Sequence, residues 1–582
     1  MVFLSPDRMN AGLLARFARR RFAPNGADLV ALALIAAGGV LLVHGAQEMN
    51  LPVANLHTTP VVLDPARLPE YALRTTLRMF AAILASLVFT FVVATAAAKS
   101  RKAGMVIVPM LDILQSVPVL GFLTFTVTFF MGLFPTSELG AECAAIFAIF
   151  TAQAWNMAFS FYQSLRTLPA DLDEVSRQFQ LSSWRRFWRL ELPFATPALV
   201  WNTMMSMSGG WFFVVASEAI TVGKTTVTLP GIGSWLALAI GAKDFVAVAW
   251  AVGAMAVVIV LYDQLLFRPI VAWADKFRFE QTASQEQPRS WFYDILRRTR
   301  LLRRLGRPFA LALAALPRPT LPRLVMPRIG GERTAKGLDA AWLVLVGLAT
   351  LWAAWSIVRY VAATVPPREA LEAFVLGLIT LVRVIVLIAI ASLIWVPLGV
   401  WIGLRPVWAE RIQPVAQFLA AFPANVLFPI AVIAIVAWRL DPNIWLSPLM
   451  ILGTQWYILF NVVAGAAALP TDLKEVSGIF HLRSWQQWRD MILPGIFPYY
   501  VTGALTASGG SWNASIVAEV ATWGHTRLEA AGLGAFIAKA TQAGDYPRVA
   551  LGVGVMSLFV ILLNRALWRP MYGYAERRFR LE

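Results

Sequence analysis

Long apolar segments alternate with short polar segments along most of the chain. A helix that crosses the ~30 Å hydrocarbon core of a bilayer needs about 20 mostly apolar residues. By this criterion the pattern predicts about twelve spanning helices, six in each half. They lie near residues 29–43, 73–98, 105–133, 144–165, 195–220 and 246–267, and near 340–361, 373–404, 412–438, 444–468, 497–520 and 549–567. A long basic segment precedes the first span and no small-residue cleavage site stands out, so we expect this span to be retained, the alternative being a signal peptide.

Composition supports a membrane protein. Of the 582 residues, 58% are hydrophobic and 14% are charged, whereas an average soluble protein is ~45–50% apolar and ~25% charged. A soluble enzyme, a disordered chain and a disulfide scaffold are therefore excluded. A single cysteine, Cys143, allows no internal disulfide. Because the four histidines do not fall at ligand spacing either, we expect no metal site.

The net charge of +17 reflects loops that are rich in Lys and Arg. Basic clusters follow the second and fourth spans and close the chain, whereas residues 48–70 and 135–142 contain few basic residues. Cytoplasmic loops collect Lys and Arg, so this asymmetry predicts a multi-pass membrane protein with both termini in the cytoplasm. Because these loops account for the positive net charge, we expect no nucleic-acid partner. The basic segment 297–336 is then a cytoplasmic linker, and its start, residues 291–305, either lies on membrane lipid or is solvated.

The chain repeats itself. Residues 168–176, Leu-Pro-Ala-Asp-Leu-Asp-Glu-Val-Ser, correspond to residues 469–477, Leu-Pro-Thr-Asp-Leu-Lys-Glu-Val-Ser, at an offset of 301. The same offset relates Arg268-Pro269 to Arg569-Pro570. Each copy holds an even number of spans, so the copies share one orientation. The predicted fold is an all-α polytopic membrane protein of about twelve spanning helices in two parallel six-helix repeats.

The best-defined repeated segment is a polar cytoplasmic loop. Asp-x-x-Glu fits a capping box, in which the Asp side chain accepts from backbone N–H groups at the start of a helix. The Glu side chain, three residues later, accepts in return from the backbone N–H of the Asp. We therefore expect each loop to form a short helix, a second short helix that starts at a serine, and a proline before the next span. The residues are Asp171, Glu174, Ser183 and Pro193 in the first loop, and Asp472, Glu475, Ser484 and Pro494 in the second.

This loop resembles the EAA loop of binding-protein-dependent ABC importer permeases. That pattern reads Glu-Ala-Ala, three residues, Gly, nine residues, Ile, one residue, Leu-Pro. The matching residues are Glu174, Val175, Ser176, Leu190, Leu192 and Pro193, and Glu475, Val476, Ser477, Met491, Leu493 and Pro494. The glycine of the pattern is replaced by Gln180 and His481. In this family the loop is a coupling helix that docks on a separate ATPase, so the resemblance implies this role for residues 171–180 and 472–481.

The resemblance divides the chain into two ABC permease units. Residues 1–70 form an N-terminal segment with the first span and a periplasmic loop, 71–280 the first unit, 281–338 the linker, 339–372 an extra span and 373–582 the second unit. The implied location is the bacterial inner membrane, and the implied partners are two ABC ATPase subunits, a periplasmic solute-binding protein and membrane lipid. The chain itself is then a transport subunit rather than an enzyme, and it binds no cofactor, because ATP and Mg belong to the ATPases. Residues 223–225, Gly-Lys-Thr, end like a P-loop, but Glu218 stands where its first glycine is required.

Polar residues inside the spans are candidates for the pathway, because such residues usually face a cavity or a partner helix. They are Gln115, Ser116, Gln153, Asn156, Glu218, Gln455, Asn461, Asn513 and Glu519. Glu218 and Glu519 end the fifth span of each unit and either fix the outer gate through helix-end hydrogen bonds or contact the solute. For the other residues the alternative is hydrogen bonding between helices.

The sequence around the two glutamates looks like that of the nitrate, sulfonate and taurine permease branch. The hypothesis is an ATP-driven importer permease that moves a small solute from periplasm to cytoplasm by alternating access. Few acids lie in the spans, which favours an anion such as a sulfonate, a nitrate-like ion or an organic acid. The alternatives are a secondary transporter driven by an ion gradient, which would not need two matched docking loops, and a fused iron- or polyamine-type ABC permease.

Overall fold

The computed structural model describes residues 61–114, 119–134, 137–222, 225–277, 290–299, 332–469 and 484–578, and positions 308, 473, 479 and 480. The first predicted span and most of the linker lie outside these residues. The chain forms two compact units. Unit 1 comprises residues 1–46, 163–201 and 261–328, and unit 2 comprises residues 47–162, 202–260 and 329–582.

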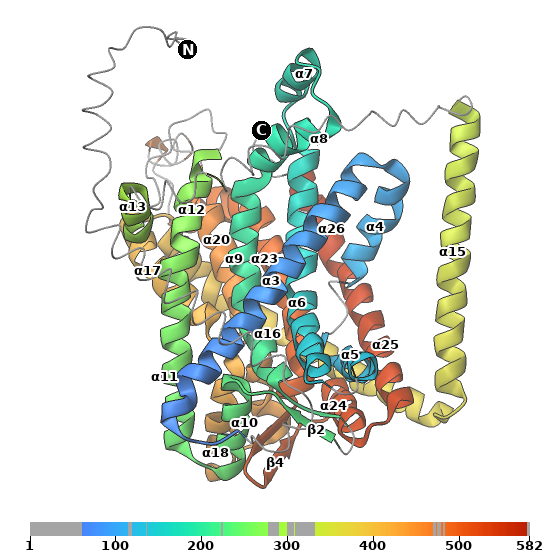
Figure 1. Cartoon of the computed structure of the whole chain (residues 1–582), viewed down its shortest axis with the longest axis vertical. Helices are drawn as coiled ribbons and strands as arrows, with labels where there is room; N and C mark the ends of the chain where they lie inside the picture. The colour runs from blue at the N-terminus through green and yellow to red at the C-terminus, as the bar shows by residue number, and fades with distance from the viewer. Residues whose placement is uncertain are drawn as a thin grey trace. The chain divides into compact units, whose positions relative to one another are not determined.

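The described residues are mostly helical (Figure 1). The longer helices of the first half are α3 (Leu68–Lys99), α4 (Arg101–Leu114), α5 (Val119–Leu133), α6 (Leu139–Arg166), α9 (Leu192–Glu218), α10 (Ile232–Ala242) and α11 (Phe245–Tyr262), which is followed by the shorter α12 (Arg268–Ala274). Those of the second half are α15 (Glu332–Ala362), α16 (Pro367–Gly403), α17 (Pro406–Ala421), α18 (Phe428–Ala437), α20 (Gln455–Ala467), α23 (Leu493–Ala518), α24 (Leu533–Ala543), α25 (Tyr546–Leu563) and α26 (Arg569–Arg578). The short helices are α7 (Ala170–Gln178), α8 (Ser183–Arg186), α13 (Trp291–Arg298), α19 (Pro442–Trp445) and α22 (Ser484–Gln487).

Six described segments are long and apolar enough to cross a membrane, or eight if two bent helix pairs each count as one span. The six are residues 65–99, 139–166, 245–277, 344–362, 367–403 and 546–575. The all-α polytopic class is therefore confirmed. The total of about twelve spans stays a prediction.

Three predicted spans are not single straight helices. The segment 444–468 is divided between residues 442–450 and α20, with a bend of 45°. The segment 105–133 falls on α4 and α5, with residues 115–118 between them outside the described part. The segment 412–438 is divided between α17 and α18, which are bent by more than 40°. Pro423 lies at this break and begins a 3₁₀ turn at Ala424. Proline lacks the N–H that a continuous helix would need, which explains the interruption.

Each half also contains a short β-hairpin that the apolar pattern did not predict. β1 (Ala219–Val222) pairs antiparallel with β2 (Thr225–Thr228), and β3 (Val520–Trp523) pairs antiparallel with β4 (Thr526–Glu529). The predicted spans at 195–220 and 497–520 therefore end about two residues too late, because α9 stops at Glu218 and α23 at Ala518. The two hairpins lie 301 residues apart.

The duplication extends to irregular backbone. π-Helical turns occur at Phe187–Glu191 and Trp488–Ile492, immediately before α9 and α23, and at Asp263–Phe267 and Asn564–Trp568, after α11 and α25. Both pairs are again 301 residues apart. The helices of the second half pack closely, with α16 against α20, α23 and α25 (Figure 1).

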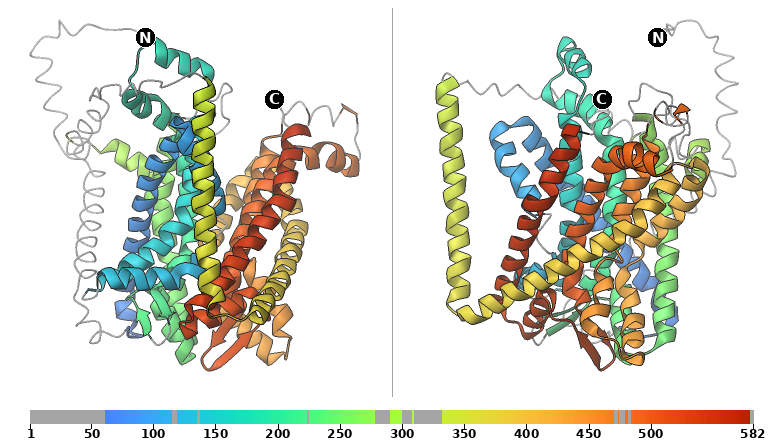
Figure 2. Two further views of the ribbon diagram at one scale, coloured as in Figure 1. Left: turned by 90° about the vertical axis from the view of Figure 1, so that its right-hand side faces the viewer. Right: turned by 180° about the vertical axis from the view of Figure 1, so that it is seen from behind.

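α15 is the least buried of the six single spanning segments in the described part of the chain. It contacts α25 and α4, and only 6% of its most apolar window is buried (Figure 2, yellow helix). Trp352 is 73% exposed and Leu351 is 68% exposed. An apolar helix surface of this extent fits contact with lipid acyl chains.

Candidate coupling loops and solute pathway

The first loop contains α7, which begins at Ala170 with Pro169 as its N-cap residue. The predicted capping box is wrong here, because Pro169 precedes the helix and no side chain caps it. Asp171 instead lies in the first turn, where a carboxylate is favoured by the helix dipole. The predicted second helix does begin at Ser183, and the hydroxyl of Ser182 accepts from the backbone N–H of Arg185.

Gln180 lies two residues after the end of α7 and has a left-handed conformation, with φ of +47°. The N–H of Gln180 donates to the carbonyl of Arg177, and the N–H of Leu181 donates to the carbonyl of Ser176. These two bonds are those of a Schellman motif, whose left-handed position is usually glycine. Gln180 therefore adopts the turn of the glycine that the EAA pattern has at this position.

A chain of ion pairs connects the parts of the first loop. Asp173 of α7 pairs with Arg186 of α8, and Nε of Arg186 donates to Glu191 Oε1 at 2.9 Å. The side chain of Glu191 is only 8% exposed and lies one residue before α9. The three charges link the short helices of the loop to the start of a long helix. The corresponding residues of the second half are Lys474, Gln487 and Ile492, which cannot form this network.

Large apolar side chains of both loops are exposed. In the first loop, Val175 is 46% exposed and Phe179, four residues later on the same helix face, is 74% exposed. In the second loop, Ile479, Phe480 and Trp485 are each 72% exposed. Apolar residues clustered on a polar loop are typical of a surface that binds another protein.

The predicted coupling residues lie as follows. Asp171, Glu174, Val175 and Gln180 are exposed, Ser176 is buried, and Pro193 and Pro494 are half-buried in the first turns of α9 and α23. Asp472, Glu475, Val476, Ser477 and His481 lie outside the described residues.

At the other end of α9, Glu218 is fully buried in a hydrogen-bonded cluster. Its Oε1 accepts from Thr75 Oγ1 at 2.7 Å and from Arg78 Nη1 at 2.6 Å, and its Oε2 accepts from the backbone N–H of Gly233 at 2.7 Å. Arg78 also binds Glu142 through two hydrogen bonds of 2.6 Å. Arg78 is therefore neutralised inside the protein, so it offers no free charge to an anion.

The second half repeats this arrangement around Glu519. Its carboxylate accepts from Thr380 Oγ1 at 2.8 Å and from Arg383 Nη1 at 3.2 Å. The backbone N–H of Ala535 donates to its other oxygen at 3.0 Å. In both halves the glutamate fastens a hairpin and the following helix to the first helix of the unit. This geometry favours the gate-fixing role over contact with solute.

The hairpins join the two halves within unit 2. β1 contacts α24, and β3 contacts α10. The N–H of Gly524, at the tip of the second hairpin, donates to the carbonyl of Ile240 at 2.9 Å. The rings of Phe245 and Trp523 lie 4.5 Å apart between centroids. Each hairpin thus packs against the other half of the chain.

β4 carries a small charged cluster. Glu529 pairs with Arg527 at 2.7 Å and with Lys539 of α24 at 2.5 Å. Partial burial works to raise the pKa of Glu529, but its bond to Lys539 and the charge of Arg527 outweigh burial and leave the pKa lowered. The carboxylate therefore stays ionised at neutral pH and helps to hold β4 on α24.

Several other predicted pathway residues bond within or between helices. Asn156 donates to Ser206 at 3.2 Å, Gln455 accepts from the indole of Trp395 at 3.0 Å, and Asn461 donates to the carbonyl of Tyr457 on its own helix at 2.8 Å. Asn513 donates to the carbonyl of Gly509 at 3.3 Å and is buried. Gln115 and Ser116 lie outside the described residues.

Gln153 is different, because it is fully buried and both amide atoms lack a hydrogen-bond partner among the described residues. It packs against Gly210, where a Cβ would lie 2.7 Å from its Nε2. At the equivalent place in the second half, Thr454 packs against Gly510 and bonds to Ser511 at 3.0 Å. The two halves therefore surround their Ser-Gly-Gly segments differently.

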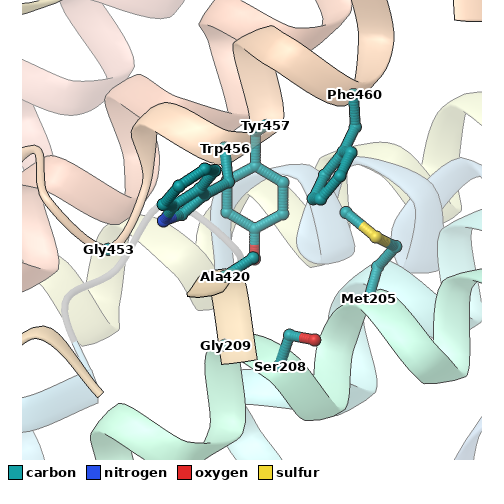
Figure 3. Close-up of a pocket in the computed structure, with 8 residues that line it drawn as sticks. All are labelled: Met205, Ser208, Gly209, Ala420, Gly453, Trp456, Tyr457 and Phe460. Carbon is teal, nitrogen blue, oxygen red and sulfur yellow. The ribbon is translucent and has the colours of Figure 1, made fainter. Parts of the chain in front are cut away.

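A small cavity, with room for about one water molecule, lies within unit 2 between the two halves (Figure 3). Its lining residues are Met205, Ser208 and Gly209 of α9, Ala420 of α17, Gly453, and Trp456, Tyr457 and Phe460 of α20. None of them is charged. Among the described residues, no cluster of three or more His, Cys, Asp or Glu could hold a metal ion.

Sequence reasoning missed the equivalent threonines Thr75 and Thr380 and the Asp173–Arg186–Glu191 network. The threonines could have been found, because they precede Arg78 and Arg383 by three residues at the same offset of 305.

Comparison with known proteins gives one family. The family model described as "Binding-protein-dependent transport system inner membrane component" matches residues 91–268 and 395–580. The chain is 29% identical over 185 residues to the nitrate import permease protein NrtB of Leptolyngbya laminosa, which covers 32% of this chain and 63% of that protein. It is 28% identical over 180 residues to the bicarbonate transport system permease protein CmpB of Synechocystis sp., covering 31% and 61%. Each match spans less than two thirds of the relative.

Proposed function

Because this chain belongs to the family of binding-protein-dependent transport system inner membrane components, we propose that it supplies both membrane halves of the permease of an ATP-driven importer. Both permease units lie in one polypeptide. The chain carries out no bond chemistry, and ATP and Mg are bound by separate ATPase subunits. Solute moves from the periplasm to the cytoplasm as the two ends of the pathway open in turn.

The two polar loops carry this proposal. Each exposes large apolar side chains, Val175 and Phe179 in one and Ile479, Phe480 and Trp485 in the other, on a segment that is otherwise polar. Such a surface is costly in water unless another protein covers it. Two ATPase subunits, one for each loop, supply that cover.

The positive-inside asymmetry supports a cytoplasmic position for both loops and both termini. The hairpins and the Glu218 and Glu519 clusters then lie at the outer end. There they hold the outer gate closed, and a periplasmic binding protein delivers solute above them. The solute is a small anion, such as a sulfonate, a nitrate-like ion or an organic acid, in keeping with the nitrate and bicarbonate permeases to which the chain is similar.

The proposal is tested by purification of the tagged chain in mild detergent. An ATPase with a P-loop should co-purify. The double variant Glu174→Lys with Glu475→Lys should abolish both this association and ATP-dependent uptake while the chain still inserts. Glu372→Lys, which changes an exposed glutamate of α16, is the matched control and should transport normally. Uptake that persists without any ATPase would refute the proposal.

A further inference from the structure

The first half contains an arginine that binds two carboxylates at once. Nε and Nη2 of Arg78 form a fork that donates to both oxygens of Glu142, each at 2.6 Å. Its Nη1 donates to Glu218 at 2.6 Å and to the carbonyl of Pro230 at 3.0 Å. Paired hydrogen bonds of this kind between a guanidinium and a carboxylate are short and directional. The fold of each half therefore allows one arginine to hold a second carboxylate beside the glutamate that follows the long helix.

Arg383 is the equivalent of Arg78 in the second half, but it binds through Nη1 alone. This atom donates to Glu519 at 3.2 Å and to the carbonyl of Ala531 at 2.9 Å. Within the described part of the chain, Nε and Nη2 of Arg383 have no hydrogen-bond partner, and neither atom is buried. The side chain is 11% exposed, whereas that of Arg78 is fully buried. The guanidinium edge that is occupied in the first half is therefore open in the second.

The carboxylate that fills this edge in the first half has no counterpart in the second. At the offset of 301, Asn443 takes the place of Glu142. Its amide oxygen accepts from the backbone N–H of Ala531 at 2.8 Å, which holds Asn443 beside the residue whose carbonyl Arg383 binds. Asp441, two residues earlier, caps α19 and accepts from the amide of Asn443 at 3.1 Å. The second half thus preserves the place of the second carboxylate but supplies a neutral side chain there.

A second exchange changes the local charge in the same direction. Four residues before Glu142, Glu138 is buried in the first half. Its position in the second half is Arg439, which is exposed and lies four residues before Asn443. Two carboxylates of the first half are therefore replaced by a cation and a neutral amide. Cationic groups that gather near a binding surface raise the local concentration of anions.

We infer that the open edge of Arg383 is a binding site for a small oxyanion that offers two oxygens in one plane, as a carboxylate, nitrate or bicarbonate does. The anion takes the place that Glu142 takes at Arg78, and its oxygens accept from Nε and Nη2 while Nη1 stays on Glu519. No enclosed pocket is needed, because both donors reach the surface of the protein. As a step in solute entry, next to the contacts that hold the outer gate closed, this site rests on the proposed importer function.

The test uses the full chain in nanodiscs of phosphatidylcholine, a lipid without a carboxylate. Acetate is the probe, and saturation-transfer NMR at its methyl group is the readout. Nitrate should displace acetate, whereas chloride at equal concentration offers no pair of oxygens and should displace it far less. Arg383→Lys retains the charge but loses the fork, so acetate should bind at least about tenfold more weakly. Arg405→Lys makes the same exchange at an arginine that bonds to the carbonyl of Trp401, and it should bind acetate like the original chain.

Asn443→Glu gives the second half the carboxylate that the first half has at this place. The new side chain should occupy the fork from within the protein and abolish acetate binding. Asn443→Gln has the same length without the charge and should still bind acetate, so it controls for the lost bond to Ala531.

Acetate binding that is unchanged in Arg383→Lys and in Asn443→Glu would overturn the inference. Equal losses in Asn443→Glu and Asn443→Gln, or displacement by chloride as effective as displacement by nitrate, would also contradict it. The assay needs no ATPase, so its result is separate from the co-purification test. A chain that binds its ATPase but not acetate would refute the Arg383 site alone.

Discussion

Gln180 adopts a backbone conformation that costs a non-glycine residue about 1–2 kcal/mol. The two bonds of the Schellman motif compensate for part of this cost, and an unbranched Gln tolerates the conformation better than a β-branched residue would. The EAA pattern located this turn although its glycine is missing. Sequence alone could not show whether the turn survives the replacement, because that depends on hydrogen bonds to Arg177 and Ser176.

Substitutions at Gln180 should distinguish the contribution of the left-handed turn to ATPase docking from the contribution of the glutamine side chain. Gln180→Gly should retain transport, since glycine adopts a positive φ without strain. Gln180→Val should destabilise the turn by about 1–2 kcal/mol and reduce ATPase co-purification about tenfold. Pull-down of the ATPase with each variant measures the effect. Equal pull-down by the Gly and Val variants would show that the left-handed turn does not matter for docking.

Arg186 offers a second test at this scale. Arg186→Gln breaks its pairs with Asp173 and Glu191 and gives the first loop the residue that the second loop has at this position, Gln487. Because Glu191 is buried and would lose its charged bond to Arg186, we expect a cost of about 1–3 kcal/mol and slower uptake per ATP hydrolysed. Arg177→Gln is the control, because Arg177 is 75% exposed and its pair with Asp173 contributes about 0–1 kcal/mol. An equal loss in both variants would contradict a special role for the network.

At the scale of elements, the apolar pattern predicted helices well wherever the apolar run is unbroken. α3, α6 and α16 match their predicted spans to within about six residues at each end. The prediction failed where backbone chemistry outweighs hydropathy, as at Pro423, and at the hairpins. β1 and β3 continue the apolar runs of α9 and α23, so hydropathy cannot mark the change from helix to strand. That change is fixed by Glu218 and Glu519, whose carboxylates bind backbone N–H groups of the next helix.

The hairpin contacts predict a gate that can be locked. The rings of Phe245 and Trp523 lie 4.5 Å apart between centroids. In a Cys143→Ser background, the two substitutions Phe245→Cys and Trp523→Cys should therefore give thiols that a short bifunctional thiol reagent can join. The cross-linked chain should lose uptake, because the two halves can no longer separate at the hairpins. Uptake should be measured before and after cross-linking, with each single-cysteine variant as a control. Full uptake by the cross-linked chain would mean that these contacts do not open during transport.

At the scale of the whole molecule, the duplication was visible in the sequence and reappears in the hairpins, the π-helical turns and the Glu218 and Glu519 clusters. The sequence could not show at which equivalent positions the two copies have different contact partners. Arg78 has a second carboxylate partner in Glu142, and the position 301 residues later is Asn443, which instead bonds to the backbone N–H of Ala531. Such differences depend on which helices meet, so an internal alignment identifies the positions but not their partners.

The contacts between halves predict that the covalent linker is dispensable. Within unit 2 the halves meet along α5 and α25, where Thr128 bonds to Tyr546 at 2.9 Å, and where Gly524 bonds to Ile240. These contacts need no continuous chain. Two fragments made by opening the chain between residues 310 and 330 should therefore co-purify when expressed together and restore uptake, whereas either fragment alone should not transport. Fragments that insert but fail to associate would show that the halves depend on the linker, because tethering raises their effective concentration.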